Sequence, residues 1–253
     1  KHEYDNLRIQ TKFAICILVA ILTPFVLLGS AFYNRLYDMI ATDIVRNEQE
    51  AASRTVPQIE RVLSQVTKTY SMIVESEYWE KNQQIELEQM IYGLLESGYV
   101  KNIKIYVDIP KEDIFFTEKV ITDVYQPVSL IKGTYWYGIF QGSSPEYLYC
   151  PPFYMGNQEK QKYGDCAYIV AENMIYKENL YPCYIAIYYD SKPIAQILQE
   201  GISFPGSLSY IINEREAVIA SSDDYLTGMY YVQYADINRY LMSSNNFIEN
   251  SIM

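Results

Sequence analysis

The chain has 253 residues, of which 49% are apolar and 15% aromatic, and it carries a formal net charge of −11 at pH 7. This apolar content excludes a disordered chain and is enough for one or two ordinary cores. The acidic balance argues against nucleic acid as a partner, because such binding depends on Lys and Arg neutralising phosphates. The single histidine, His2, stands near the start of the chain. Hydrolysis by a Ser-His-Asp or Cys-His site, and catalysis at a His-ligated zinc, are therefore excluded for the residues that follow.

Residues 13–34 carry no charge and are mostly apolar. A helix of this length covers roughly the 30 Å hydrocarbon core of a bilayer, so the segment predicts a transmembrane helix. Basic residues precede it, and the positive-inside rule places residues 1–12 in the cytoplasm as a short tail and the chain after residue 34 outside the cell membrane. The alternative is a cleaved signal peptide, with Gly29 and Ala31 as small residues near the cleavage point, although the apolar region of a signal peptide is usually shorter.

Residues 35–80 are predicted to form a stalk helix. The stretch 35–79 lacks glycine and is rich in strong helix formers. Apolar residues recur at spacings of three and four on one face, namely Ile59, Val62, Leu63, Val66, Tyr70 and Ile73. Pro57 either kinks this helix or lies in the first turn of a second one. The face either belongs to a signalling stalk, which the direct fusion to residues 13–34 favours, or only packs on the chain's own domain.

Residues 81–203 are predicted to form a membrane-distal domain of the α+β class. A helix over residues 84–95 ends near Gly98. Strand-like runs follow at 102–108, 114–117, 134–141, 146–150, 166–176 and 183–189, and the last leads through Asp190 into a short helix. Consecutive strands joined by short hairpins indicate an antiparallel sheet covered on one side by helices.

Residues 204–253 are predicted to begin a second, smaller unit. A hairpin over 209–212 and 217–220 turns at residues 213–216, and a possible helix follows around 234–242. So few residues cannot bury a core of their own. We therefore expect the chain to be the N-terminal part of a longer protein.

The cysteines outside residues 13–34 are Cys150, Cys166 and Cys183. Cys150 ends one strand-like run and Cys166 begins the next, which makes a disulfide between them plausible in an oxidising compartment. The alternative is three reduced, buried thiols, and sequence does not decide between the two. The cysteine spacing lacks a Cys-x-x-Cys pair and no phosphate-binding loop is found, so no metal or cofactor is expected.

Four segments together resemble the YesM-like bacterial sensor histidine kinases, whose outer part is a double Cache ectodomain. They are LRIQTKF at residues 7–13, TPFVLLG at 23–29, Tyr135-Trp136-Tyr137, and PCYIAIYYD at 182–190. The resemblance implies a long helix and two PAS-like sheets, with a small molecule bound to the membrane-distal one. It also implies a homodimer whose catalytic part lies downstream and acts on a cytoplasmic response regulator.

The same resemblance singles out Trp136, Tyr137 and Asp190 as ligand-binding residues. Amino-acid-binding members carry an Arg two residues before the Trp-Tyr pair, where this chain has Thr134. Without that guanidinium, capture of a ligand carboxylate lacks its usual donor, so a carbohydrate or another solute that is not an amino acid is expected.

Aromatic residues in the strand-like runs are further candidates for the ligand site. Phe116, Tyr149 and Tyr168 belong to this group, and their rings could stack on a sugar or another flat ligand. The plainer interpretation is that aromatic residues are common in strands and simply build the core.

The sequence therefore predicts the ligand-sensing part of a membrane-bound two-component sensor kinase, with no catalysis in this segment. Two alternatives stay open. The same sensor could serve a chemoreceptor, a cyclase or a membrane-bound transcription regulator. The chain could instead be an anchored extracellular solute-binding protein or hydrolase, since glycoside hydrolysis by paired carboxylates needs no histidine.

Overall fold

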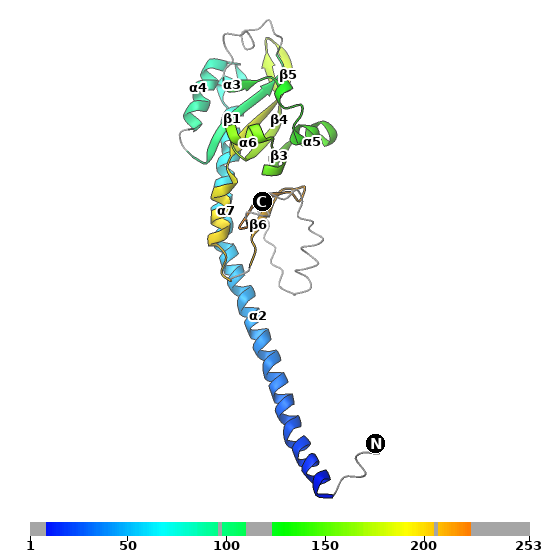
Figure 1. Ribbon diagram of the computed structural model, residues 1–253. Coiled ribbons are helices and arrows are strands. Elements are labelled where there is room, and N and C mark those ends of the chain that lie inside the picture. The colour runs from blue at the N-terminus through cyan, green and yellow to red at the C-terminus, as the bar shows by residue number, and fades with distance from the viewer. Residues whose placement is uncertain (1–8, 96–97, 110–122, 205–206, 224–253) are drawn as a thin grey trace. The chain divides into compact units, whose positions relative to one another are not determined.

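The computed structural model describes residues 9–95, 98–109, 123–204 and 207–223 (Figure 1). The chain divides into two compact units, Lys1–Gln49 and Glu50–Met253. One helix, α2 (Ile9–Val74), begins in the first unit and ends in the second. The predicted strand at 114–117, with Phe116, and the possible helix at 234–242 lie outside the described residues.

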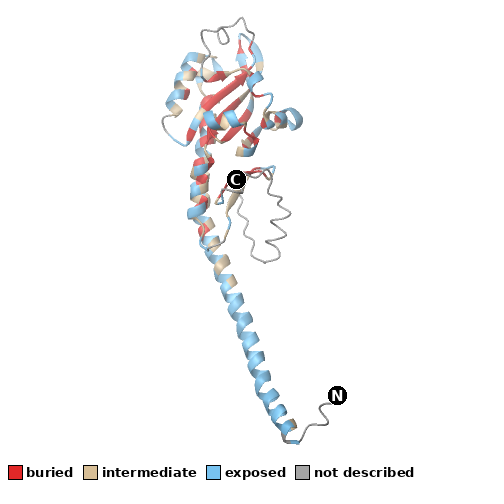
Figure 2. Cartoon of the chain, in the orientation of Figure 1, coloured by how far each residue is buried: buried red, intermediate tan, exposed pale blue. Residues whose placement is uncertain are grey.

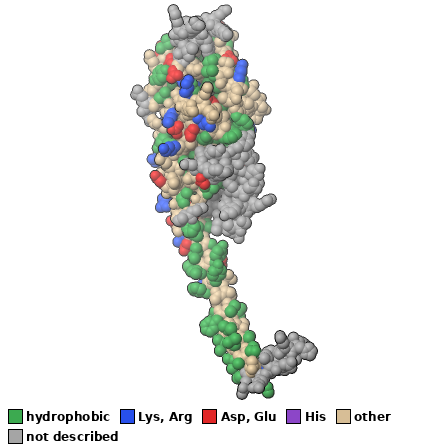
Figure 3. Space-filling model, in the orientation of Figure 1, with side chains coloured by type: hydrophobic (Ala, Val, Ile, Leu, Met, Phe, Trp, Pro, Cys, Tyr) green, Lys and Arg blue, Asp and Glu red, His purple; other side chains and the backbone are tan. Residues whose placement is uncertain are grey.

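The described part of the first unit is helical and its apolar side chains are exposed. Phe13, Phe25 and Leu28 are each about 70% exposed, and Figures 2 and 3 show this exposed hydrophobic stretch of α2. By length and composition, α2 could cross a membrane. A signal sequence or the core helix of a soluble protein would meet the same two criteria. None of its most apolar window is buried in the structure, so this surface requires lipid or another apolar partner to cover it.

In the second unit, α2 presents the predicted apolar face. Ile59, Val62, Val66 and Ile73 are buried, at the spacings that place them on one side of a helix. The helix continues through Pro57, so neither a break nor a second helix occurs there. Two short helices follow, α3 (Glu77–Glu80) and α4 (Gln84–Leu95), and the second has the bounds that its apolar pattern predicts.

A five-stranded sheet forms the centre of the second unit, with strand order β2-β1-β5-β4-β3. The strands are β1 (Val100–Val107), β2 (Tyr125–Gln126), β3 (Tyr147–Cys150), β4 (Cys166–Tyr176) and β5 (Asn179–Tyr189). β5 pairs antiparallel with β1 and β4, and β3 pairs antiparallel with β4. β2 pairs parallel with β1. The fold is therefore α+β as predicted, but the sheet is mixed, not purely antiparallel.

The two faces of the sheet bury different side chains, because successive residues of a strand point to opposite sides. The face toward α2, here called the α2 face, packs against α2, α4 and α7 (Ser191–Glu200) and includes Ile105, Tyr168 and Ile187. The opposite face, here called the α5 face, includes Tyr106, Ile169 and Tyr188. Helices therefore cover one face fully, and shorter elements cover the other.

The elements on the α5 face correct one prediction. Residues 134–141 are a helix, α5 (Tyr135–Ser143), and not a strand. Thr134 caps it, since its Oγ1 accepts a hydrogen bond from the amide of Tyr137 at 3.3 Å. Trp136 and Phe140, four residues apart, are both buried on its inner side. The remaining elements here are η1 (Val128–Leu130), η2 (Pro152–Tyr154) and α6 (Asn157–Lys162).

The chain after β5 follows the predicted order. α7 follows Asp190, and the hairpin consists of β6 (Tyr210–Ile212) and β7 (Val218–Ser221). Asp190 makes no capping hydrogen bond. Asp165 performs that role, because its carboxylate accepts from the amide of Ser191 at 2.6 Å and from its hydroxyl at 2.7 Å.

Cys150, Cys166 and Cys183 are buried free thiols in the structure, which agrees with the second of the two alternatives, and the candidate disulfide between Cys150 and Cys166 is not formed. The strand register explains this result. Cys150 lies opposite Ala167, one residue away from Cys166, and a one-residue offset places two side chains on opposite faces. Cys150 belongs to the cluster on the α5 face, whereas Cys166 belongs to the α2 face.

Candidate functional site

The described candidate ligand residues do not form one site. Trp136 and Tyr137 lie on α5, over the α5 face of the sheet. Tyr149 and Tyr168 pack on the α2 face. Asp190 lies at the end of β5, where its carboxylate forms an ion pair with Lys101. Two separate clusters of polar and aromatic groups must therefore be considered.

The first cluster surrounds the Glu159 carboxylate on the α5 face. Its Oε1 accepts hydrogen bonds from the Tyr188 hydroxyl at 2.9 Å and from the Trp136 indole nitrogen at 3.3 Å. Its Oε2 accepts from the amide of Gly156 at 3.0 Å. The Tyr106 and Tyr188 hydroxyls are 2.7 Å apart. Burial raises the pKa values of both phenols, so they stay protonated and donate in this network.

Trp136 is part of the core in this arrangement. Its exposure is 0%, and its ring lies 6.0 Å from the rings of both Tyr106 and Tyr184. Tyr137 is half-buried and its ring is 5.6 Å from that of Tyr184. Ligand access to Trp136 would therefore require α5 to move away from the sheet, whereas Tyr137 is partly accessible as it stands.

Lys104 is a buried cation on the same side of the sheet. Its ammonium is paired with the side-chain and backbone oxygens of Asp123, the side-chain oxygen at 3.0 Å, and lies 4.7 Å from the centre of the Tyr163 ring. Burial lowers the pKa of Lys104, and Asp123 opposes this shift. Within the described ranges, no group of three or more His, Cys, Asp or Glu side chains could hold a metal ion.

The second cluster, here called the tyrosine cluster, comprises Tyr70, Tyr147, Tyr149 and Tyr168. Ring centres are separated by 4.9 Å for Tyr149 and Tyr168, 5.8 Å for Tyr147 and Tyr168, 6.1 Å for Tyr147 and Tyr149, and 6.0 Å for Tyr70 and Tyr168. Three rings come from β3 and β4, and the fourth comes from α2. The cluster therefore joins the edge of the sheet to the helix.

Hydrogen bonding and burial fix the protonation of this cluster. The Tyr70 hydroxyl donates to the Glu172 carboxylate of β4. Burial, followed by this contact, raises the pKa of Tyr70. Burial also raises the pKa of Tyr168 to about 12. Tyr70 and Tyr168 are therefore neutral at physiological pH, and the aromatic rings of the cluster have electron-rich faces.

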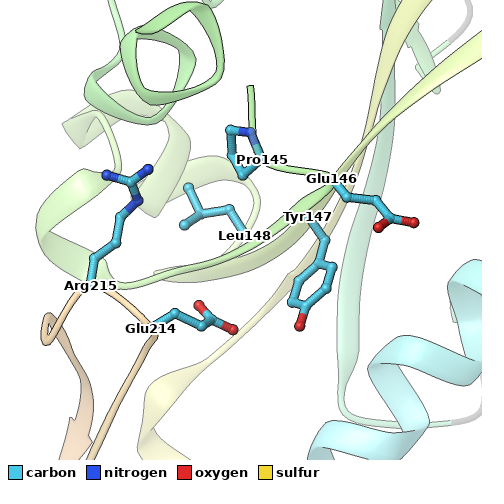
Figure 4. Close-up of a pocket in the computed structure, with 6 residues that line it drawn as sticks. All are labelled: Pro145, Glu146, Tyr147, Leu148, Glu214 and Arg215. Atoms are coloured by element: carbon cyan, nitrogen blue, oxygen red, sulfur yellow. The ribbon is translucent and has the colours of Figure 1, made fainter. Parts of the chain in front are cut away.

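A hollow lies next to the tyrosine cluster, at the edge strand β3 (Figure 4). It is lined by Pro145, Glu146, Tyr147, Leu148, Glu214 and Arg215. Figure 4 shows the Glu214 carboxylate directed toward the Tyr147 side of the hollow and the Arg215 guanidinium directed away from it. Arg215 donates to the hydroxyl of Ser143 at the end of α5. Tyr147 therefore belongs both to the hollow and to the tyrosine cluster.

The turn between β6 and β7 supplies one wall of this hollow. Asn213 is buried there and its side-chain amide donates to the backbone oxygen of Tyr149 at 2.9 Å. Its side-chain oxygen accepts from the amides of Arg215 and Ala217 at 2.9 and 3.0 Å. Asn213 therefore both shapes the turn and attaches it to β3.

Sequence reasoning missed several residues of these two clusters. Tyr70 was recognised only as part of an apolar helix face, and Glu172, Glu159 and Asn213 were not singled out. A tyrosine on an otherwise aliphatic helix face is a usable signal, because a buried phenol generally needs a polar partner. For Glu159 and Asn213 the sequence offers no such signal, since the partners that bring them into these clusters, Tyr188 and Tyr149, are distant in the chain.

Comparison of this chain with protein-family models, with curated proteins and with solved structures finds no match.

Proposed function

We propose that this chain is the ligand-sensing and signal-transmitting portion of a membrane-bound sensor histidine kinase. Residues 13–34 anchor it in the cell membrane, residues 1–12 lie in the cytoplasm, and the second unit lies outside. A small molecule binds the second unit and displaces α2. A kinase encoded downstream then acts, as a homodimer, on a cytoplasmic response regulator. The kinase output rests on the resemblance of four short segments and on no feature of the fold.

The observation that carries the sensing part of this proposal is the composition of α2. The same helix contains the uncharged apolar residues 13–34 and the buried face that packs on the sheet. It also contributes Tyr70 to the tyrosine cluster, where the Tyr70 hydroxyl binds Glu172. A change at this cluster therefore acts directly on a helix that continues into the apolar segment.

Such a device requires two arrangements of α2 with different affinities for the ligand. A ligand that binds both arrangements equally shifts nothing, however tightly it binds. The Tyr70–Glu172 contact is a candidate for the element that differs, because it is a polar contact between α2 and β4 that adds to the ring contact of Tyr70 with Tyr168. Binding beside it can favour or disfavour one position of the helix.

Topology is the first test. We would replace Cys16 by Ser and introduce either Lys132→Cys, at an exposed position, or Lys12→Cys in the predicted cytoplasmic tail. A membrane-impermeant maleimide should label Lys132→Cys in intact cells and Lys12→Cys only after permeabilisation. The reverse pattern, or release of the labelled protein into the medium, would refute the proposal.

Ligand response is the second test. The full chain in lipid nanodiscs would be screened by thermal shift against carbohydrates and other solutes that are not amino acids. A true ligand stabilises the folded state by mass action. It should also change amide hydrogen exchange in residues 50–74 of α2. A ligand that raises the unfolding temperature and leaves exchange in α2 unaltered would contradict signal transmission through this helix.

A further inference from the structure

Three rings of the tyrosine cluster are arranged as a wall beside an open hollow. Tyr147, Tyr149 and Tyr168 lie within 6.1 Å of one another, measured between ring centres. Tyr147 is 43% exposed and lines the hollow, while Tyr168 behind it is buried. The face of an aromatic ring is electron-rich and attracts cations. Tyr147 is thus open to solvent in part, and the rings of Tyr149 and Tyr168 support it.

Carboxylates accompany these rings. Glu146 and Glu214 line the same hollow, and Glu172 binds Tyr70 within the tyrosine cluster. None of the three takes part in the salt bridges found within the described part of the chain. Arg215 also lines the hollow and keeps its positive charge, because its hydrogen-bond acceptor Ser143 is neutral. Glu146 and Glu214 together outweigh this single cation, so the hollow combines a net negative charge with an aromatic surface.

We propose that this hollow binds an organic cation through an alkylated ammonium group, with Tyr147 contacting the methyl groups and Glu214 supplying the counter-charge. Such a cation is large and weakly hydrated, so it gains from contact with rings. A small metal ion would require several converging oxygen ligands, and the described residues supply no cluster of that kind. An uncharged sugar could stack on Tyr147 and donate hydroxyl hydrogen bonds to the carboxylates, but it would gain no Coulomb attraction from their charge.

The position of the site connects it to α2. Tyr147 touches Tyr168, which in turn touches Tyr70 of α2, with ring centres 5.8 and 6.0 Å apart. A cation on Tyr147 that reorients Tyr168 therefore reaches the helix through one intermediate ring. This connection would make an organic cation the ligand of the proposed sensor, and in that respect the inference rests on the proposed function. Binding of the cation in the hollow does not depend on the sensor function.

The test measures binding of choline to the full chain in lipid nanodiscs by titration calorimetry. The comparison ligand is the neutral isostere of choline, in which carbon replaces the quaternary nitrogen. We expect saturable binding of choline, with little binding of the isostere. Tyr147→Ala should weaken choline binding by about tenfold, and Glu214→Gln by about threefold. Tyr147→Phe keeps the ring and should retain the affinity within about twofold.

The matched control is Tyr92→Ala on α4. Tyr92 is 44% exposed, close to the 43% of Tyr147, and a carboxylate lies beside it, because its hydroxyl donates to Glu88. This variant should bind choline as the unaltered chain does.

Three results would overturn the inference, namely no saturable choline binding, equal binding of the isostere, or unchanged binding in Tyr147→Ala. If choline fails while another solute stabilises the chain and alters exchange in α2, the cation site is wrong and the sensor proposal stands. Choline binding that leaves exchange in α2 unaltered supports the cation site and counts against the sensor proposal alone.

Discussion

The contact between Tyr70 and Glu172 should couple α2 to the sheet by a measurable free energy. The phenol donates to a carboxylate, and both side chains are half-buried. Hydrogen bonds to charged groups contribute about 1.5–3 kcal/mol when buried. Partial exposure reduces this figure, because water screens the charge and competes for the carboxylate. We therefore expect a coupling free energy of about 1 kcal/mol between the two side chains.

A double-mutant cycle measures this coupling. The variants are Tyr70→Phe, Glu172→Gln and the combination, and the quantity compared is the free energy of unfolding from chemical denaturation. Trp79 and Trp136, the only tryptophans of the chain, report unfolding of the second unit by fluorescence. The non-additive part of the three changes is the coupling free energy.

A second tyrosine–glutamate pair provides the control for this cycle. The Tyr92 hydroxyl donates to Glu88 at 3.1 Å within α4, where Tyr92 is exposed and Glu88 is half-buried. The corresponding cycle should give no more than about 0.5 kcal/mol. A coupling at Tyr70–Glu172 as small as that of the control pair would refute the claim that this contact attaches α2 to the sheet.

Three further predictions concern single positions. Gly164→Ala should destabilise the second unit by about 2 kcal/mol or more, as measured by denaturation, because φ at Gly164 is +144° and an added Cβ would lie 2.8 Å from the backbone oxygen of Tyr189. Asn213→Ala should cost about 2 kcal/mol and speed amide exchange in the β6–β7 hairpin, because the contact with Tyr149 is lost. Burial raises the pKa of Tyr168 from 10.0 to about 12, so its stabilising contribution is complete below pH 10 and is lost as the pH rises through about 12. The free energy of unfolding should fall over this window more steeply than in Tyr168→Phe.

Each of these predictions has its own check. Gly133→Ala is the control for the glycine, because an added Cβ there meets no atom within 4 Å, and equal costs at the two glycines would contradict the steric argument. Asn179→Ala removes an exposed amide that bonds only locally, to Lys177, and should leave the β6–β7 hairpin unaffected. For the pH prediction, the free energy of unfolding could fall equally steeply with pH in the unaltered chain and in Tyr168→Phe. That result would show that burial of the Tyr168 hydroxyl does not cause the fall.

The sequence located the central strands because the apolar pattern of a strand is local. Alternation over 102–108 and the strand-like apolar run within 166–176 are visible without knowledge of any partner strand, and β1 and β4 occupy these positions. It misassigned 134–141, because Tyr, Trp, Ile and Phe favour strands in general. The spacing of four between Trp136 and Phe140, and the capping position of Thr134, are the signals that point to a helix. Strand β2 has two residues and pairs with β1, so no local pattern could reveal it.

The candidate sites were harder to predict because they depend on distant partners. Tyr70 meets Glu172 across 102 positions of the chain, and Asn213 meets Tyr149 across 64. Which face of the sheet a strand residue occupies follows from the register, and register depends on the whole sheet. The sequence therefore identifies individual aromatic residues in the strands as candidates, but it does not show which face of the sheet each of them occupies.

Cys150 pairs with Ala167, one residue away from Cys166, and this offset has a practical consequence. The backbone of the sheet separates these two sulfur atoms. Cys183 shares a face with Cys166, but it lies six residues from Tyr189, the residue that pairs with Cys166, which is about 20 Å along the strand. Cysteine pairs so far apart cannot be bridged without moving the backbone. We therefore expect this unit to fold identically in reducing and oxidising surroundings, so that production of the protein needs no disulfide catalysts.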